Sequence, residues 1–153
     1  MKKIKNILVT GGAGFIGSHT VDLLVSKKYN VTVLDNFSFG KKIWVNKKAK
    51  IIKGDIKNLK TCINSCNQID AVFHFAAMSR AGPSQEAITK CINENVLGTK
   101  NILEASRIRK IKKFVYAGSS TYYGNIRGFQ KENFNNNCLN PYALSKYLGE
   151  ELC

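Results

Sequence analysis

The chain has 153 residues, a length typical of one globular domain that buries a sizeable core. Its hydrophobic content of 44%, charged content of 22% and mean hydropathy of −0.19 are ordinary globular values. The sequence contains neither an apolar run of bilayer length nor a signal peptide, so we expect a cytoplasmic protein with no membrane partner.

The net charge of +14 and the isoelectric point near 9.7 raise the hypothesis of a nucleic-acid-binding domain. The basic residues are mostly lysines in short scattered runs such as Lys2-Lys3 and Lys47-Lys48. Arginine is scarce, and no aromatic residues alternate with the lysines to stack on bases. We therefore expect a solvated basic surface and no nucleic-acid partner; RNA binding stays as an alternative that a salt-dependent oligonucleotide assay would test.

The five cysteines are an odd number and lack the rhythm of metal ligands. Cys62 and Cys66 are four residues apart, but neither His19 nor His74 lies at a spacing that would complete a zinc site. We expect reduced thiols and no metal.

Residues 4–9 form the first apolar segment and predict a strand, which leads into a glycine-rich turn. The fingerprint Gly12-x-Gly14-x-x-Gly17 predicts a tight turn at Gly12, close approach of a phosphate at Gly14 and helix–strand packing at Gly17. The helix predicted from about Phe15 to Lys27 would present its N–H groups and positive dipole end to a pyrophosphate.

A second strand is predicted at Val31–Leu34, and it ends in Asp35 about twenty residues beyond the fingerprint. A carboxylate at this position accepts hydrogen bonds from the adenosine ribose hydroxyls and repels a 2′-phosphate. The sequence therefore favours NAD as cofactor. Lys41 and Lys42 lie close by and keep NADP open as an alternative.

Apolar and helical segments alternate along the rest of the chain. Further strands are predicted at residues 51–53, 71–75 and 114–117, and helices at about 58–66, 85–109 and 141–153, with a polar loop at 133–140. This alternation predicts an α/β fold in which residues 1–153 form one domain, a Rossmann-type doubly wound parallel sheet with helices on both faces. Ligands of such sheets bind beyond the carboxyl ends of the strands.

Tyr142 and Lys146 are four residues apart on the last predicted helix and so share one face of it. A phenol with its ordinary pKa of about 10 is a weak base at neutral pH. A neighbouring ammonium lowers that pKa and makes the tyrosine a usable acid/base. A Tyr–Lys pair at this spacing also occurs on the surface of ordinary amphipathic helices. Likewise, a Ser/Thr cluster such as residues 119–121 also occurs in ordinary loops.

Together these features resemble the extended short-chain dehydrogenases/reductases, and within them the NAD-dependent epimerase/dehydratase family. The resemblance covers essentially the whole chain. The motifs that carry it are Thr10-Gly11-x-x-Gly14-x-x-Gly17, Asp35-Asn36-Phe37-Ser38, Gly54-Asp55-Ile56, His74-Phe75-Ala76-Ala77-Met78, Asn95-Val96-Leu97-Gly98-Thr99 and Ser119-Ser120-Thr121-Tyr122-Tyr123-Gly124.

The resemblance implies an NAD site built from the phosphate loop, the ribose turn, the adenine contact and the segment that lines the cofactor. Its implied residues are Gly11, Gly14, Phe15, Ile16, Gly17, Asp35, Asn36, Ser38, Asp55, Ile56, Phe75, Ala76, Ala77, Asn95, Tyr142 and Lys146. Glu94 departs from the pattern, because we expect a small polar residue at that position near the cofactor.

The resemblance also implies a reaction, the 4-epimerisation of a nucleotide sugar such as a UDP-sugar. Tyr142 would remove the proton of the sugar C4 hydroxyl while a hydride leaves C4, Lys146 would hold the nicotinamide ribose and lower the tyrosine pKa, and Ser119 would hydrogen-bond the reacting oxygen. The hydride would then return to the other face of the 4-keto sugar.

Dehydratases and other relatives of the family carry acidic residues just after the catalytic hydroxyl, where this chain has Ser120 and Thr121. The sequence therefore favours epimerisation over dehydration. Family members are considerably longer and homodimeric, so we expect these residues to be the NAD-binding part, without the C-terminal substrate domain and with weak turnover at most. The alternatives are a non-catalytic NAD-binding or dimerisation module and another nucleotide-sugar dehydratase or reductase of the same family.

Overall fold

The computed structural model describes residues 4–126, 128–132 and 137–153. Five strands form one parallel sheet in the order β3-β2-β1-β4-β5. The strands are β1 (Asn6–Thr10), β2 (Asn30–Asp35), β3 (Lys50–Lys53), β4 (Ala71–His74) and β5 (Lys113–Tyr116). This topology confirms the Rossmann-type α/β fold that the alternation of elements predicts.

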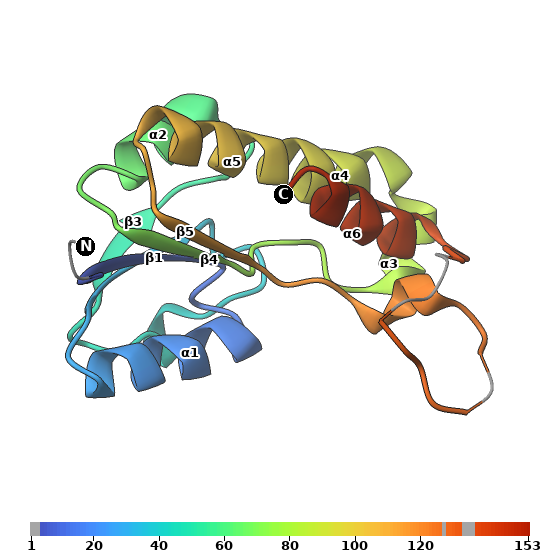
Figure 1. Ribbon diagram of the computed structural model, residues 1–153, viewed down its shortest axis with the longest axis horizontal. Helices are drawn as coiled ribbons and strands as arrows, with labels where there is room; N and C mark the ends of the chain where they lie inside the picture. Colours follow the sequence, from blue (N-terminus) through green and yellow to red (C-terminus); the bar gives the residue numbers. More distant parts are fainter. Residues whose placement is uncertain (1–3, 127, 133–136) are drawn as a thin grey trace.

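Helices cover both faces of the sheet (Figure 1). Helix α1 lies against one face, while α2 and α5 lie side by side against the other. The helices are α1 (Phe15–Ser26), α2 (Leu59–Ser65), α3 (Ala81–Glu86), α4 (Ile88–Ile92), the π-helical turn η2 (Asn93–Leu97), α5 (Gly98–Ile108) and α6 (Pro141–Glu151), with short 3₁₀ turns η1 (Lys42–Trp44) and η3 (Ser120–Tyr123).

The central strand β1 divides the core into two halves, because successive side chains of a strand point to opposite faces. Val9 packs into the cluster that contains Val21 of α1. Leu8 packs into the cluster on the other face, together with Ile102 of α5. Both strand residues are fully buried, so β1 anchors the helices on the two faces.

The prediction of one continuous helix at about residues 85–109 is wrong. Helix α3 begins earlier, at Ala81, because Pro83 lies in its first turn, where a backbone N–H has no intrahelical partner. The helical conformation is then interrupted at Ala87, which has φ −136° and ψ 60°, and α4, η2 and α5 follow. The other predicted helices and strands agree with the structure to within two residues.

The polar loop predicted at residues 133–140 is only partly covered, since residues 133–136 lie outside the described residues. Asn137 donates from its backbone N–H to the Tyr122 carbonyl oxygen, 2.8 Å away. Asn140 caps α6 by accepting a hydrogen bond from the Ala143 N–H at 2.9 Å, and Pro141 occupies the first turn of the helix as expected.

Among the helices of the described residues, none combines the length and the apolar character that a membrane crossing requires.

A buried histidine joins the sheet to the helical layer. His74, at the end of β4, is 1% exposed, and its Nδ1 lies 2.6 Å from the Thr10 hydroxyl oxygen. Its Nε2 lies 3.0 Å from the Thr99 hydroxyl oxygen, and that hydroxyl donates to the carbonyl oxygen of Asn95. Since Thr99 gives its proton to Asn95, it accepts one from Nε2–H, which leaves Nδ1 as the acceptor for Thr10. The imidazole is therefore neutral and satisfied at both nitrogens.

We expect His74 to make the protein less stable in mild acid. Burial lowers the pKa of the folded imidazole from 6.5 to about 3, with the charge of Lys146 acting in the same direction. In mild acid the unfolded chain therefore binds a proton at His74 that the folded chain does not bind. The contribution of His74 to the free energy of unfolding is fully present above about pH 6.5 and decreases as the pH falls toward 3. The slope should be about 1.4 kcal/mol per pH unit in the free energy of unfolding.

Urea unfolding at several pH values between about 7 and 5 measures this slope. His74→Asn should remove it, whereas His19→Gln, which changes the chain's other histidine, should leave it unchanged. An identical pH dependence in the wild-type protein and His74→Asn would contradict the prediction.

Candidate functional site

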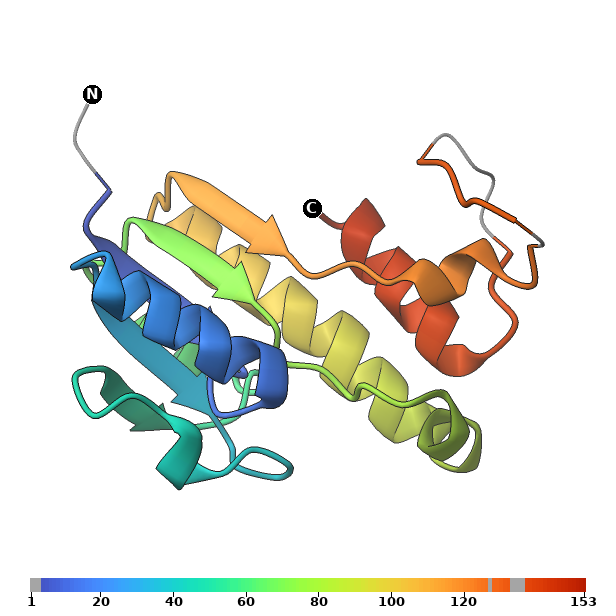
Figure 2. The same ribbon diagram turned by 90° about the horizontal axis from the view of Figure 1, so that it is seen from below.

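A cleft of about 330 Å³ opens at the carboxyl ends of the strands, where α6 approaches the sheet. Figure 2 shows the strand arrows pointing toward the side on which α6 lies. Most of the residues predicted for the NAD site line its walls, namely Gly11, Phe15, Ile16, Gly17, Asp35, Asn36, Ser38, Asp55, Ile56, Phe75, Ala76, Ala77, Tyr142 and Lys146. The walls also include Leu34, Phe39, Gly40, Gly54, Ser79, Glu94, Ala117 and Gly118.

The tight turn after β1 lies at Gly11, which corrects the assignment to Gly12. Gly11 has φ +68°, and a Cβ on it would lie 2.6 Å from the backbone nitrogen of Ala76. Its own N–H donates to the Leu34 carbonyl oxygen at 2.9 Å, so the chain must turn at once after β1. A Cβ on Gly17 would overlap the Gly11 carbonyl oxygen, which confirms close packing between the turn and α1.

The first turn of α1 faces the cleft. Gly14 is its N-cap in an extended conformation, and the nearest atom to a Cβ built there is the Gly11 carbonyl oxygen at 3.3 Å. The side chains of Phe15 and Ile16 are largely exposed. The first N–H groups of a helix have no intrahelical partner, and the dipole there is positive. This donor set fits a pyrophosphate.

Asp35 holds the glycine turn against the end of β2. Its Oδ2 accepts from the Ala13 N–H at 2.9 Å and its Oδ1 from the Phe37 N–H at 2.8 Å. The carboxylate lines the cleft although the residue is only 8% exposed. Its charge disfavours a phosphate at this position. Lys41 is one of the two lysines that leave NADP as an alternative cofactor in the sequence. Its ammonium lies over the Trp44 ring, 5.2 Å from the centroid.

Tyr142 and Lys146 lie on the cleft side of α6, as their spacing predicts. Lys146 is 5% exposed, and its ammonium lies 4.1 Å from the ring centroid of Tyr116 on β5. The Tyr116 hydroxyl donates to the Lys146 carbonyl oxygen at 3.1 Å. Burial lowers the pKa of Lys146 to about 8, although the charge of Glu150 acts in the opposite sense. A largely protonated lysine is therefore held inside the cleft at neutral pH.

Ser119 lies one residue beyond the wall formed by Ala117 and Gly118. Its hydroxyl lies 2.8 Å from that of Thr121 and accepts a hydrogen bond from the Thr121 N–H, so it caps η3. The structure thus brings two of the three predicted catalytic side chains into the cleft wall and leaves the third at its edge.

Asn95, a predicted cofactor residue, is 1% exposed and is not among the residues that line the cleft. Its Oδ1 accepts from the Met78 N–H at 2.7 Å, and its Nδ2 donates to the Ser145 hydroxyl at 2.8 Å. Ser145 in turn donates to the Tyr142 carbonyl oxygen. Asn95 therefore links the segment after β4 to α6.

Sequence reasoning missed two residues that support the site, Tyr116 and Ser145. Ser145 is adjacent to Lys146, so its position inside the Tyr142–Lys146 motif was an available signal. Tyr116 gave no comparable signal, because its contact with Lys146 joins residues 30 positions apart in the chain.

The chain matches known proteins in sequence. The family model described as "NAD dependent epimerase/dehydratase family" matches residues 7–153. A protein of Methanocaldococcus jannaschii, provisionally named UDP-glucose 4-epimerase, is 46% identical over 149 residues, which are 95% of this chain and 48% of that protein. The UDP-glucose 4-epimerase of Drosophila melanogaster is 35% identical over 163 residues, covering 95% of this chain and 47% of that enzyme.

Solved structures agree with these matches. The UDP-glucose 4-epimerase of Thermotoga maritima, crystallised with UDP-glucose, superposes with a TM-score of 0.91 at 35% identity, over 95% of this chain and 49% of that one. The Thermus thermophilus enzyme in complex with NAD gives 0.92 at 33% identity, over 95% and 49%. The chain therefore spans about half the length of these relatives. Its sequence and its fold place it in the NAD-dependent epimerase/dehydratase family.

Proposed function

We propose that these residues form the cofactor-binding part of a nucleotide-sugar 4-epimerase that uses NAD. The observation that carries the proposal is the shared cleft: Tyr142 and Lys146 face the same space as the glycine turn at Gly11 and the carboxylate of Asp35. Relatives named UDP-glucose 4-epimerase support it. By the same resemblance, the whole protein acts on a UDP-sugar as a homodimer in the cytoplasm.

NAD supplies a hydride acceptor when it is bound. The N–H groups at the start of α1 would hold its pyrophosphate, and Asp35 would accept hydrogen bonds from the adenosine ribose. Asp55 and Ile56 lie in the cleft wall where the family pattern has its adenine contact. Phe75–Ala77 and Lys146 would flank the nicotinamide ribose.

Tyr142 acts as the base in this proposal and accepts the proton of the sugar C4 hydroxyl. Lys146 would support that step, because an ammonium attracts the negative charge that develops on a nearby oxygen. The Tyr116 ring holds that ammonium in place, and burial raises the pKa of Tyr116, so its own phenol stays protonated. Ser119 would donate a hydrogen bond to the reacting oxygen. The same residue would return that proton to the C4 oxygen when the 4-keto sugar is reduced from its opposite face.

The proposal favours epimerisation over loss of water from the sugar. Elimination needs a proton donor and an acceptor beside the catalytic hydroxyl. Ser120 and Thr121 follow Ser119 in this chain, and neither carries a carboxylate.

The chain should bind NAD and prefer it to NADP. Asp35→Asn removes the charge that opposes a 2′-phosphate, so the preference should fall by roughly ten-fold, the usual scale for one charged hydrogen bond. Calorimetric titration of both dinucleotides measures it. Asp22→Asn is the matched control, since Asp22 accepts from the Asn46 side chain and does not line the cleft. A folded chain without affinity for NAD would reject the proposal.

Tyr142→Phe should lower epimerase turnover at least about 100-fold, because it removes the proton acceptor and keeps the ring. The rate of interconversion of UDP-galactose and UDP-glucose by the full-length protein measures this turnover. Tyr147→Phe makes the same change one residue after Lys146, where the ring packs against Tyr122, and should leave turnover unchanged. Equal losses in both variants would exclude Tyr142 as the base.

A further inference from the structure

The loop that carries Ser119 is joined to α6 by a pair of polar side chains, Tyr122 and Glu150. Tyr122 lies in η3, the short turn that Ser119 caps, and its hydroxyl donates a hydrogen bond to the Glu150 carboxylate on α6. Figure 2 shows η3 packed beside α6, although Tyr122 and Glu150 are 28 positions apart in the chain. The pair therefore connects the loop after β5 to the helix that carries Tyr142 and Lys146.

The hydroxyl and the carboxylate of this pair lie against the backbone of Gly118, the residue before Ser119. A Cβ built on Gly118 would lie 2.6 Å from the Tyr122 hydroxyl oxygen and 3.1 Å from the Glu150 Oε2. Gly118 lines the cleft, whereas neither Tyr122 nor Glu150 does. The pair thus contacts the cleft wall without lining the cleft, so any effect on a bound ligand must pass through other residues.

Two further contacts of Tyr122 hold η3 near α6. The Tyr122 ring packs edge-on against that of Tyr147 on α6, with ring centroids 6.0 Å apart. Its carbonyl oxygen accepts from the Asn137 N–H at 2.8 Å, in the segment that leads into α6. Burial and the bond to Glu150 raise the pKa of Tyr122 to about 12, so its hydroxyl remains a donor at neutral pH. Because a hydrogen bond is directional, this donor fixes the orientation of a turn that ring packing alone would leave free to slide.

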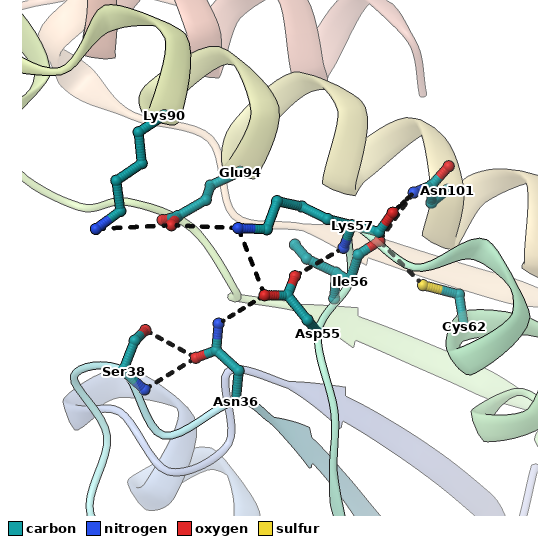
Figure 3. Close-up of polar contacts among 9 residues, drawn as sticks. All are labelled: Asn36, Ser38, Asp55, Ile56, Lys57, Cys62, Lys90, Glu94 and Asn101. Atoms are coloured by element: carbon teal, nitrogen blue, oxygen red, sulfur yellow. Dashed lines mark hydrogen bonds and ion pairs between the residues drawn. The ribbon is translucent and has the colours of Figure 1, made fainter.

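Glu150 also lies one turn after Lys146, at the spacing that brings two side chains of a helix together. Lys146 is buried, and among the described residues it forms no ion pair with a carboxylate. The other end of the cleft differs, because the Lys57 ammonium lies 3.5 Å from Asp55 and 3.9 Å from Glu94 (Figure 3). The charge of Glu150 on the neighbouring turn therefore matters more to Lys146 than a second carboxylate would matter to Lys57.

The ionisable groups around Lys146 are His74 on β4, Tyr116 on β5, Tyr142 and Glu150 on α6, and Cys153 just beyond α6. Burial keeps His74 neutral, and it raises the pKa of the Tyr116 phenol and of the Cys153 thiol. Glu150 is the carboxylate in this group. Its negative charge favours the ammonium form of the buried lysine.

We infer that Tyr122 and Glu150 are positioning residues for the reaction: their hydrogen bond fixes the Ser119 loop on α6 and so sets where the Ser119 hydroxyl lies relative to Tyr142. The same carboxylate places a negative charge one turn from Lys146. This inference rests on the proposed function. Since neither side chain lines the cleft, turnover should depend on the pair more than substrate binding does.

Tyr122→Phe tests the hydrogen bond, because it removes the hydroxyl and keeps the ring. In the full-length protein it should lower kcat for the interconversion of UDP-galactose and UDP-glucose about ten-fold, the usual scale for one hydrogen bond to a charged group. KM should stay within about two-fold of the wild-type value. Tyr147→Phe is the matched control, since it removes a hydroxyl from the ring that packs against Tyr122, and it should change neither constant. A raised KM with an unchanged kcat in Tyr122→Phe would contradict the inference.

Two substitutions of Glu150 separate the hydrogen bond from the charge. The amide oxygen of Glu150→Gln still accepts from Tyr122, so kcat at the pH optimum should stay within about two-fold of the wild-type value. Glu150→Ala should lose about as much as Tyr122→Phe. Adding Tyr122→Phe to Glu150→Ala should cost no further activity, because the two side chains act through one bond.

The charge has a readout of its own, the pKa of Lys146. Without the carboxylate this pKa should fall below its wild-type value of about 8 in both Glu150→Gln and Glu150→Ala. An NMR titration of the Lys146 side chain measures it without substrate. Glu151→Gln makes the same charge change at the next residue, which is exposed, and should alter neither this pKa nor kcat. A Lys146 pKa that is the same in wild type and Glu150→Gln would overturn the electrostatic part of the inference.

The outcomes distinguish this inference from the proposed function. A full-length wild-type protein without epimerase activity rejects the proposed function and this inference with it. An active wild-type protein whose kcat is unchanged in Tyr122→Phe keeps the function and rejects the positioning role. If Tyr122→Phe does not fold, equal losses of kcat in Glu150→Gln and Glu150→Ala would reject that role as well.

Discussion

The cleft depends on a close approach between backbones directly after β1. The left-handed turn at Gly11 brings the chain against the backbone of Ala76, in the segment that follows β4. Gly17 then lets α1 start directly over that turn. Any side chain at these two positions would separate the segments, because the neighbouring atoms are backbone atoms and cannot rotate away. The N-terminus of α1 reaches the carboxyl edge of the sheet for this reason.

A chain of buried hydrogen bonds extends this arrangement to the helical layer. It runs from Thr10 through His74 to Thr99 and the backbone of Asn95. The Asn95 side chain continues it to Ser145 on α6. Buried polar groups are costly unless they are paired, so such a network favours one relative position of its members. It thereby positions the helix that carries the proposed base.

The electrostatics of the cleft differ between its two ends. At the α6 end, the buried Lys146 places its ammonium against the ring of Tyr116. At the other end, Asp35, Asp55 and Glu94 line the wall, and the Lys57 ammonium lies 3.5 Å from Asp55 and 3.9 Å from Glu94.

The sequence by itself determined the α/β fold, the glycine turn to within one residue and the common face of Tyr142 and Lys146. These features follow from local periodicity and from contacts between near neighbours in the chain. Only the tertiary structure decided that the turn lies at Gly11, that the helix after β4 breaks at Ala87, and that Ser119 lies at the edge of the cleft. The tertiary structure also placed the Tyr116 ring beside Lys146. Those outcomes depend on packing between segments far apart in the chain, and a local sequence pattern carries no information about which side chains meet there.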